Sequence, residues 1–317
     1  MKRLSVVYMG TPDFAVPSLE RIAAHEAFEV PLVITQPDRP KGRGKKLAPP
    51  PVKQAAEKLG IEVVQPSDIN AWDMEENLNS LEPDFFVVAA FGQILSEAIL
   101  SIPKIFPINI HASLLPKYRG ASPIQASILN MDRETGITTM VMEKGLDSGG
   151  MLMQDSIPIS NEDTAQTMHD RLALLGADLI VDTLLRTAEG EMHPVPQDHT
   201  QATFARLLTK EDGRINWEKP SRQIKAHINA MTPWPGAFSF LNGQRMKIFK
   251  IHVTDQKSVH APGTVFLCDE QGIHVSTTDN TILILELMGA SGKRLTADAY
   301  LKGNKIEKEC MFYLIDE

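Results

Sequence analysis

An asparagine and a histidine stand two residues apart in the apolar segment of residues 107–116. If this segment is a strand, Asn109 and His111 point to the same side of the sheet, because strand side chains alternate with period two. The segment ends in Ser113 and Pro116, which places the pair near the carboxyl end of its strand, where open α/β sheets bind ligands. A purely structural histidine is the alternative. The pattern indicates an amide and an imidazole that share one target.

A glycine-rich loop at residues 145–150 adds the carboxylate of Asp147. Aspartate is common in turns, so this residue by itself indicates little. Together with Asn109 and His111 it supplies a hydrogen-bond donor, a proton-transfer group and an acid, a set that suits acyl transfer. The serines of these segments have no nucleophile-elbow context, and no reactive thiol is nearby. We therefore predict acyl transfer without a covalent acyl-enzyme.

A strongly basic stretch follows the second predicted strand. Residues 39–46 contain five positive charges, two glycines and no acid. Such a stretch cannot bury itself, so we expect an exposed flexible loop that contacts phosphates at the sheet edge of Asn109 and His111. A solvated connection without a ligand is the alternative. The candidate phosphate contacts are Arg43, Lys45 and Lys46 in this loop and Lys210 and Arg214 in the second half of the chain.

Short apolar runs alternate with helix-like stretches through the first 190 residues. We predict strands at residues 4–9, 30–35, 62–64, 85–91 and 108–110, and helices at residues 17–24, 52–59, 71–81 and 124–130. Strands at residues 137–142 and 151–159 and a long helix containing Leu172 and Leu184 follow. This alternation predicts a Rossmann-like, mostly parallel sheet with helices on both faces.

The remainder of the chain has a different pattern. Residues 191–209 are proline-containing and aperiodic, which is typical of a linker. A helix at residues 220–231 precedes five short strands with a hairpin signal at Asn242-Gly243, which predicts a small OB-like β-barrel. We expect Trp217 and Trp234 to be packing anchors. The predicted parts are a catalytic domain at residues 1–190, a linker at residues 191–209 and a barrel at residues 210–317.

Composition and charge exclude several classes of protein. The chain has 317 residues, 43% hydrophobic and 23% charged, which indicates a globular protein of about two domains. Apolar runs shorter than the roughly 20 residues of a membrane span, and an N-terminus without a secretory pattern, predict a cytoplasmic protein. The turn at Gly10 lacks the later glycines of a dinucleotide fingerprint, which disfavours a nicotinamide cofactor. Cys268 and Cys310 predict neither a disulfide framework nor a zinc site.

The net charge of −8 is unevenly distributed. Residues 1–206 hold 18 basic and 27 acidic residues, a balance of −9, whereas the rest holds 14 and 13, a balance of +1. A polyanion can therefore approach the second part of the chain without meeting a large negative charge.

These motifs resemble those of the folate-dependent formyltransferases. The signature consists of Asn109-Ile110-His111, residues 113–120 and the loop Gly145-Leu146-Asp147-Ser148-Gly149. The start Gly10-Thr11-Pro12-Asp13-Phe14, the basic residues 42–46, Asn216-Trp217 and Pro233-Trp234-Pro235 resemble the tRNA-specific branch of that family. Two positions depart from the family pattern, since Lys117 stands where arginine is common and Gly150 where aspartate is common.

The resemblance implies formyl transfer from 10-formyltetrahydrofolate to the α-amino group of methionyl initiator tRNA, without a metal. Asn109, His111 and Asp147 would be catalytic. Asp147 would either accept the amine proton or orient His111, and the sequence leaves both roles open. We expect a monomer that does not bind membranes. The residues implied to border the folate are Ser113, Leu114, Leu115 and Pro116.

Three other functions are compatible with the pattern. Related catalytic domains formylate small amines such as amino sugars, but those reactions would not need residues 39–46 together with residues 207–317. A non-catalytic tRNA-binding protein would not need Asn109, His111 and Asp147 intact. A hydrolase would release formate from the folate without an amine acceptor.

Overall fold

The computed structural model describes residues 3–41, 46–307 and 309–313. Its contacts divide the chain into two compact units. The first consists of Met1–Pro123, Glu134–Ile157 and His169–Ala205, and the second of Ile124–Arg133, Pro158–Met168 and Arg206–Glu317. No helix in these described ranges is both long and apolar enough to cross a bilayer.

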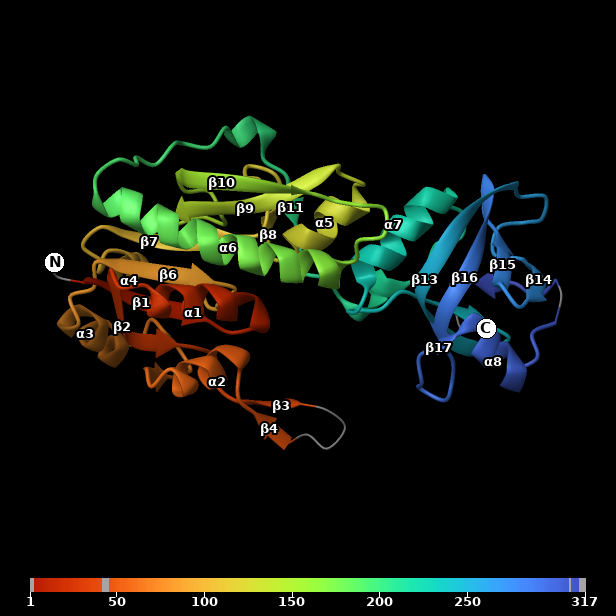
Figure 1. Ribbon diagram of the computed structural model, residues 1–317, viewed down its shortest axis with the longest axis horizontal. Helices are drawn as coiled ribbons and strands as arrows, with labels where there is room; N and C mark the ends of the chain where they lie inside the picture. The colour runs from red at the N-terminus through yellow and green to blue at the C-terminus, as the bar shows by residue number, and fades with distance from the viewer. Residues whose placement is uncertain (1–2, 42–45, 308, 314–317) are drawn as a thin grey trace. The chain divides into compact units, whose positions relative to one another are not determined.

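A seven-stranded sheet forms the centre of the first unit (Figure 1). Its order is β10-β9-β7-β6-β1-β2-β5, and the pairs from β7 to β5 are parallel, whereas β9 runs antiparallel to β7. The mostly parallel sheet that the alternating pattern predicted is therefore confirmed. The strands are β1 (Leu4–Gly10), β2 (Phe28–Ile34), β5 (Glu62–Val64), β6 (Phe85–Ala89), β7 (Phe106–His111), β9 (Glu134–Val141) and β10 (Met151–Pro158).

Helices cover both faces of this sheet, because each face of the central strands is apolar. On β1, Val7 and Met9 belong to the same buried cluster as Met74 and Leu78 of α3. The alternate residue Tyr8 points the other way, and its hydroxyl donates to the Ala15 carbonyl at the start of α1. The helices are α1 (Val16–Ala24), α2 (Pro51–Lys58), α3 (Trp72–Ser80), α4 (Glu97–Leu100), α5 (Pro123–Leu129) and α6 (Ala165–Ala188).

The basic stretch is more ordered at its ends than we expected. Arg39–Lys41 and Lys46–Ala48 pair as the short antiparallel strands β3 and β4. The prediction of one flexible loop is wrong at these ends, because backbone pairing there does not require buried side chains. Arg43 and Lys45 lie outside the described residues, and Lys46 begins β4.

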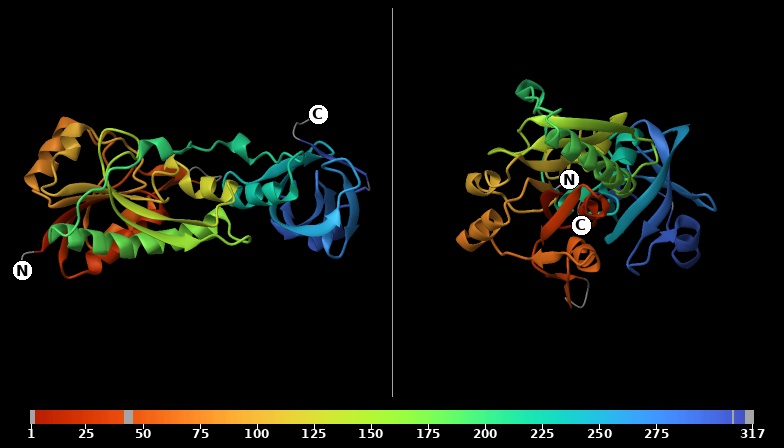
Figure 2. Two further views of the ribbon diagram at one scale, coloured as in Figure 1. Left: turned by 90° about the horizontal axis from the view of Figure 1, so that it is seen from above. Right: turned by 60° about the vertical axis from the view of Figure 1, so that its left-hand side comes forward.

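The second unit contains an antiparallel sheet that curls toward a barrel, as the left view of Figure 2 shows. Its order is β14-β15-β16-β13-β12-β18, with β17 beside β16. Backbone hydrogen bonds from Val265 to Cys310 and from Phe312 to Gly263 join the two ends of this order, so the predicted small barrel is confirmed. The elements are α7 (Ser221–Met231), β12 (Phe238–Leu241), β13 (Gln244–Lys257), β14 (Val265–Asp269), β15 (Gly272–Ser276), β16 (Asn280–Met288), β17 (Leu295–Thr296), α8 (Ala297–Gly303) and β18 (Phe312–Tyr313).

The two tryptophans of this unit differ in burial. Trp217 is 3% exposed, its indole N–H donates to Ser239 Oγ at 2.9 Å, and its ring stacks on Phe312. Trp234 is 51% exposed in the loop after α7. The expectation of a packing anchor is therefore confirmed for Trp217 and wrong for Trp234, because the prolines on either side of Trp234 keep it in a surface turn.

Candidate active site

The strand β7 presents Asn109 and His111 on one face of the sheet. Ile110, between them, points to the other face, where a side chain added at Gly176 of α6 would lie 3.0 Å from it. His111 is the last residue of β7, so the pair stands at the carboxyl end of a central strand. The side chains of β7 therefore alternate between the two faces of the sheet, as the sequence predicted.

Asp147 meets both side chains from a different segment. Its Oδ2 lies 3.6 Å from His111 Nδ1, and its Oδ1 accepts a hydrogen bond from Asn109 Nδ2 at 3.4 Å. The side chain of His111 is 6% exposed and that of Asp147 is 16% exposed. The amide, the imidazole and the carboxylate thus surround one small, largely dehydrated region that retains access to solvent.

The two ring nitrogens of His111 have different environments. Nε2 lies 3.0 Å from the Tyr118 carbonyl oxygen, so this nitrogen carries the proton and donates it there. Nδ1 therefore remains to accept or release a proton beside Asp147. Burial lowers the pKa of His111, and the charge of Asp147 and the Tyr118 carbonyl only partly oppose this effect. The imidazole is consequently neutral near pH 7.

The conformation of the loop that carries Asp147 is restricted by a hydrogen bond and by close contacts at its glycines. The Gly120 N–H donates to Asp147 Oδ2 at 2.7 Å, and Asp147 itself has a φ of +48°. A Cβ added at Gly149 would lie 2.0 Å from the Val141 carbonyl oxygen. At Gly150 it would lie 2.6 Å from Pro194 Cβ, which explains why this chain has glycine at that position.

Gln197 supports this loop and was not identified from the sequence. Its side-chain amide donates to the carbonyl oxygens of Asp147 at 2.9 Å and Gly149 at 2.8 Å. Its Oε1 accepts from Arg119 Nε at 3.0 Å and Nη2 at 2.7 Å. Gln197 is 5% exposed and Arg119 is 4% exposed. No sequence signal marks Gln197, because it lies in the aperiodic segment that we interpreted as a linker.

The same segment pairs with the short strand that contains Arg119 and Gly120. Phe204–Ala205 forms β11, which runs parallel to β8 (Arg119–Gly120). Gly120 has a φ of +111°, and a Cβ there would lie 2.6 Å from the Ala205 carbonyl oxygen. Glycine at this position therefore allows the close approach that brings Arg119 and the Gly120 N–H to the site.

The residues that the resemblance places beside the folate differ in accessibility. Ser113 is fully buried, and its hydroxyl donates to the Lys117 carbonyl at 2.6 Å. Leu115 is also buried, at 3% exposure. Leu114 and Pro116 are partly exposed. Only the latter two can touch a ligand without a rearrangement.

A cavity of about 350 Å³ lies at the carboxyl ends of neighbouring strands of this sheet. Thr11 follows β1, Gln36 follows β2, and Phe91 and Gly92 follow β6, and all four line it together with Arg39. The turn that follows Gly10 thus borders a pocket.

The two predicted polyanion contacts in the second unit lie close together in sequence. Lys210 is exposed in the 3₁₀ helix Lys210–Gly213. Arg214 is exposed directly after it, forms an ion pair with Glu211, and lies 5.9 Å from the centre of the Phe238 ring.

Comparison with known families covers both parts of the chain. Residues 2–184 match the formyl transferase family, and residues 207–305 match the formyl transferase C-terminal domain. Solved structures share the fold at low identity. An N-formyltransferase from Helicobacter canadensis, in complex with folinic acid and dTDP-3-aminofucose, has a TM-score of 0.68 and 23% identity, covering 90% of this chain and 99% of its own.

Curated relatives are considerably more similar. A methionyl-tRNA formyltransferase from Citrifermentans bemidjiense is 45% identical over 307 residues, which is 97% of this chain and 96% of the relative. Another, from Geobacter metallireducens, is 46% identical over 307 residues, with 97% and 98% covered. Identity of this degree over nearly the whole chain, with both domains matched, shows that the chain belongs to the methionyl-tRNA formyltransferase family.

Proposed function

We propose that the chain transfers the formyl group of 10-formyltetrahydrofolate to the α-amino group of methionyl initiator tRNA, giving N-formylmethionyl-tRNA for translation initiation. The observation that carries the proposal is the convergence of Asn109, His111 and Asp147 from two segments at the carboxyl end of β7. These groups supply what formyl transfer to an amine requires, and family membership supports the substrate.

The first step is attack by the neutral amine on the formyl carbon. A free α-amino group titrates near ~8, so a substantial fraction is neutral at physiological pH. As the new C–N bond forms, the carbonyl electrons move to oxygen and the nitrogen becomes acidic. His111 Nδ1 accepts that proton in this mechanism, since Nε2–H is already committed to the Tyr118 carbonyl.

The second step is loss of the folate. The oxygen electrons re-form the C=O bond, the bond to the folate nitrogen breaks, and the proton held by His111 passes to that nitrogen. The sequence left two roles for Asp147. Both of its carboxylate oxygens already accept hydrogen bonds, from Asn109 and Gly120, which supports the orienting role. Asp147 then stabilises the transient imidazolium of His111.

The developing oxyanion needs a donor that is in place before the reaction. Asn109 is half-buried on β7, and its side-chain amide is held through Asp147. Such a preorganised donor typically contributes about 10² to 10³ in rate. In this proposal Asn109 donates to the oxyanion, and the reaction uses no metal.

The folate needs apolar surface beside these groups for the faces of its rings, whereas the edge of its pterin carries hydrogen-bonding groups. Leu146, next to Asp147, is 62% exposed, and Leu114 and Pro116 are accessible. We assign these side chains to the folate site. Ser113 and Leu115 shape it from behind rather than by direct contact.

The tRNA needs a phosphate-binding surface in addition to the site of reaction. We assign this role to Arg43, Lys45 and Lys46 and to Lys210 and Arg214. We propose that the domains meet at a linker between residues 190 and 210 and that the protein is a monomer. The enzyme is expected to act in the cytoplasm, where charged tRNA is used.

One assay tests the proposed function. The protein is incubated with 10-formyltetrahydrofolate and methionyl initiator tRNA, and N-formylmethionine is measured after deacylation. We expect rapid formylation of the initiator and much slower formylation of a charged elongator tRNA. Formylation of amino sugars in place of tRNA, or release of formate without an acceptor, would contradict the proposal.

A further inference from the structure

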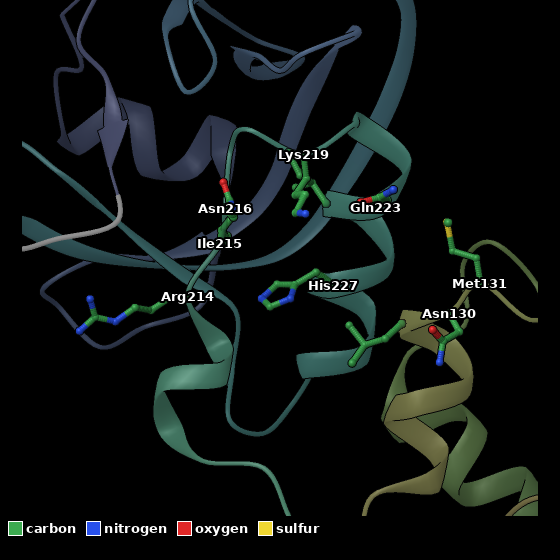
Figure 3. Close-up of a pocket in the computed structure, with 10 residues that line it drawn as sticks. Asn130, Met131, Arg214, Ile215, Asn216, Lys219, Gln223 and His227 are labelled. Atoms are coloured by element: carbon green, nitrogen blue, oxygen red, sulfur yellow. The ribbon is translucent and has the colours of Figure 1, made fainter. Parts of the chain in front are cut away.

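The second unit contains a cavity of about 490 Å³ that takes no part in the proposed reaction (Figure 3). Its walls come from the end of α5, the residues after the 3₁₀ helix Lys210–Gly213, and α7, all within the second unit. Cavities of about 300 to 1,000 Å³ are the size that binds small organic groups. This cavity is therefore large enough for one nucleotide.

The charge of the cavity wall favours an anion. Of its ten lining residues, Arg214 and Lys219 are basic and none is acidic. The Lys219 side chain is exposed and has no acidic partner within the described ranges, whereas Arg214 is also paired with Glu211. A phosphate can thus bind Lys219 without displacing an existing ion pair.

His227 provides a hydrogen-bond acceptor that has no donor. Burial lowers the pKa of His227, which keeps the ring neutral, and one ring nitrogen is hydrogen-bonded to the backbone of Gly213. The other, Nε2, is buried without a partner among the described residues. In Figure 3 this ring extends from α7 toward Ile215, below Lys219. A buried acceptor without a donor is costly, and a ligand N–H or O–H would remove that cost.

The remaining wall suits a flat, polar ring. Three amide side chains, those of Asn130, Asn216 and Gln223, border the cavity and offer both donors and acceptors. Leu129 and Met131, which are 36% and 51% exposed, supply apolar surface against which a ring can lie. A nucleic-acid base combines two apolar faces with a hydrogen-bonding edge, and its phosphate supplies the negative charge.

We propose that this cavity binds one unpaired nucleotide of the tRNA substrate. The base lies against Leu129 and Met131, a donor of the base or ribose bonds to His227 Nε2, and the phosphate lies at Lys219. The proposal rests on the proposed function, which supplies RNA as the partner. A free nucleotide has the same chemistry, so the experiment includes both sources.

The experiment compares two cavity variants with a charge-matched control. Lys219→Ala removes the cation, and Gln223→Trp fills the cavity without changing charge at an exposed position of α7. Arg222→Ala removes an exposed cation that does not line the cavity. Dissociation constants are measured for uncharged initiator tRNA and for the four free nucleoside 5′-monophosphates, and kcat and KM are measured with methionyl-tRNA.

We expect Lys219→Ala and Gln223→Trp each to weaken tRNA binding by about tenfold, as loss of one base contact does, with kcat at saturating tRNA unchanged. Arg222→Ala should change tRNA affinity by less than about twofold, because Arg222 does not line the cavity and an isolated exposed charge contributes little. Equal losses in all three variants would show a diffuse basic surface and overturn the proposal. So would unchanged tRNA affinity in Gln223→Trp, and if only the free nucleotides then lost affinity, a free nucleotide would be the ligand.

The result is separable from the proposed reaction. Binding of uncharged tRNA needs neither formyl donor nor chemistry. If the wild-type protein fails to formylate methionyl-tRNA but Gln223→Trp still weakens tRNA binding, the cavity assignment is supported and the proposed function fails. Unchanged thermal unfolding of the variants shows that the losses do not reflect misfolding.

Discussion

At the scale of residues, the proposed chemistry depends on hydrogen bonds that hold the catalytic side chains in place before the reaction. His111 donates through Nε2 to Tyr118, and Asp147 accepts from Gly120 and Asn109. Because these bonds fix the ring and the carboxylate, proton transfer at His111 Nδ1 requires little reorganisation. The energetic value of such preorganisation lies in the rate rather than in substrate binding.

Removal of either the Asn109 or the His111 side chain tests this assignment directly. Asn109→Ala and His111→Ala should each lower kcat by about 10² or more, since each loses a group used in the transition state. The dissociation constant for tRNA should stay nearly unchanged. Ser148→Ala is a matched control in the same region, because the Ser148 hydroxyl donates to the exposed Glu143. Near-normal kcat in both site variants would remove these residues from the mechanism.

The protonation of His111 gives a second test. Its pKa is lowered by burial, and the negative charge of Asp147 raises it in part. Asp147→Asn removes that charge, so the pKa of His111 should fall further below its ordinary value of about 6.5. The measurement is an NMR titration of the His111 ring in both proteins. An upward shift in the variant would mean that Asp147 does not act on the ring electrostatically.

A third test concerns Gln197, which holds the loop of Asp147 through two hydrogen bonds. Gln197→Glu retains an acceptor for Arg119 but loses both donors to the loop carbonyls. We expect kcat to fall about tenfold, with tRNA KM little changed, because the loop loses its anchors. Gln197→Ala should be more severe, since it also removes two hydrogen bonds of the buried Arg119 guanidinium. If Gln197→Glu behaves as wild type, the loop is held in another way.

At the scale of elements, the short pairing of β8 with β11 joins distant segments at the site. The two strands are only Arg119–Gly120 and Phe204–Ala205, yet they hold the Gly120 N–H against Asp147. Long periodic elements such as β1 and α7 follow from hydrophobic pattern. A two-residue strand has no period, so β8 and β11 could not be predicted from the sequence.

The requirement for glycine in this pairing can be tested. Gly120→Ala places a Cβ 2.6 Å from the Ala205 carbonyl oxygen at a φ of +111°. We expect a loss of roughly 1–3 kcal/mol in the free energy of unfolding, the usual cost of such strain, together with reduced kcat. Gly60→Ala is the control, because Gly60 also has positive φ but nothing within 4 Å. Equal destabilisation by both substitutions would show that the contact with Ala205 is unimportant.

At the scale of the whole molecule, the net negative charge limits where the protein can bind RNA. The chain carries −8 in total, and the excess of acid lies before residue 207. A negatively charged protein that binds RNA must concentrate its cations locally. We propose that the basic residues of segment 39–46 and the cations around α7 are such concentrations.

Salt dependence tests the first of these concentrations. Arg43→Ala should raise KM for methionyl-tRNA and flatten the log-log dependence of tRNA affinity on salt by about 0.7 to 0.9, the value of one phosphate contact. Lys58→Ala, an exposed lysine at the end of α2, is the charge-matched control and should leave the slope unchanged. The same slope in Arg43→Ala and wild type would exclude Arg43 as a phosphate contact.

The sequence by itself determined the mostly parallel sheet and the barrel, and it singled out Asn109, His111 and Asp147 as candidates, because hydrophobic periodicity and motif chemistry are local properties. Only the tertiary structure decided which backbone groups hold these side chains, since Tyr118, Gly120 and Gln197 act through contacts between segments far apart in the chain. The cavity around His227 has the same origin. Its walls come from three segments, and no local pattern specifies a space that exists only between them.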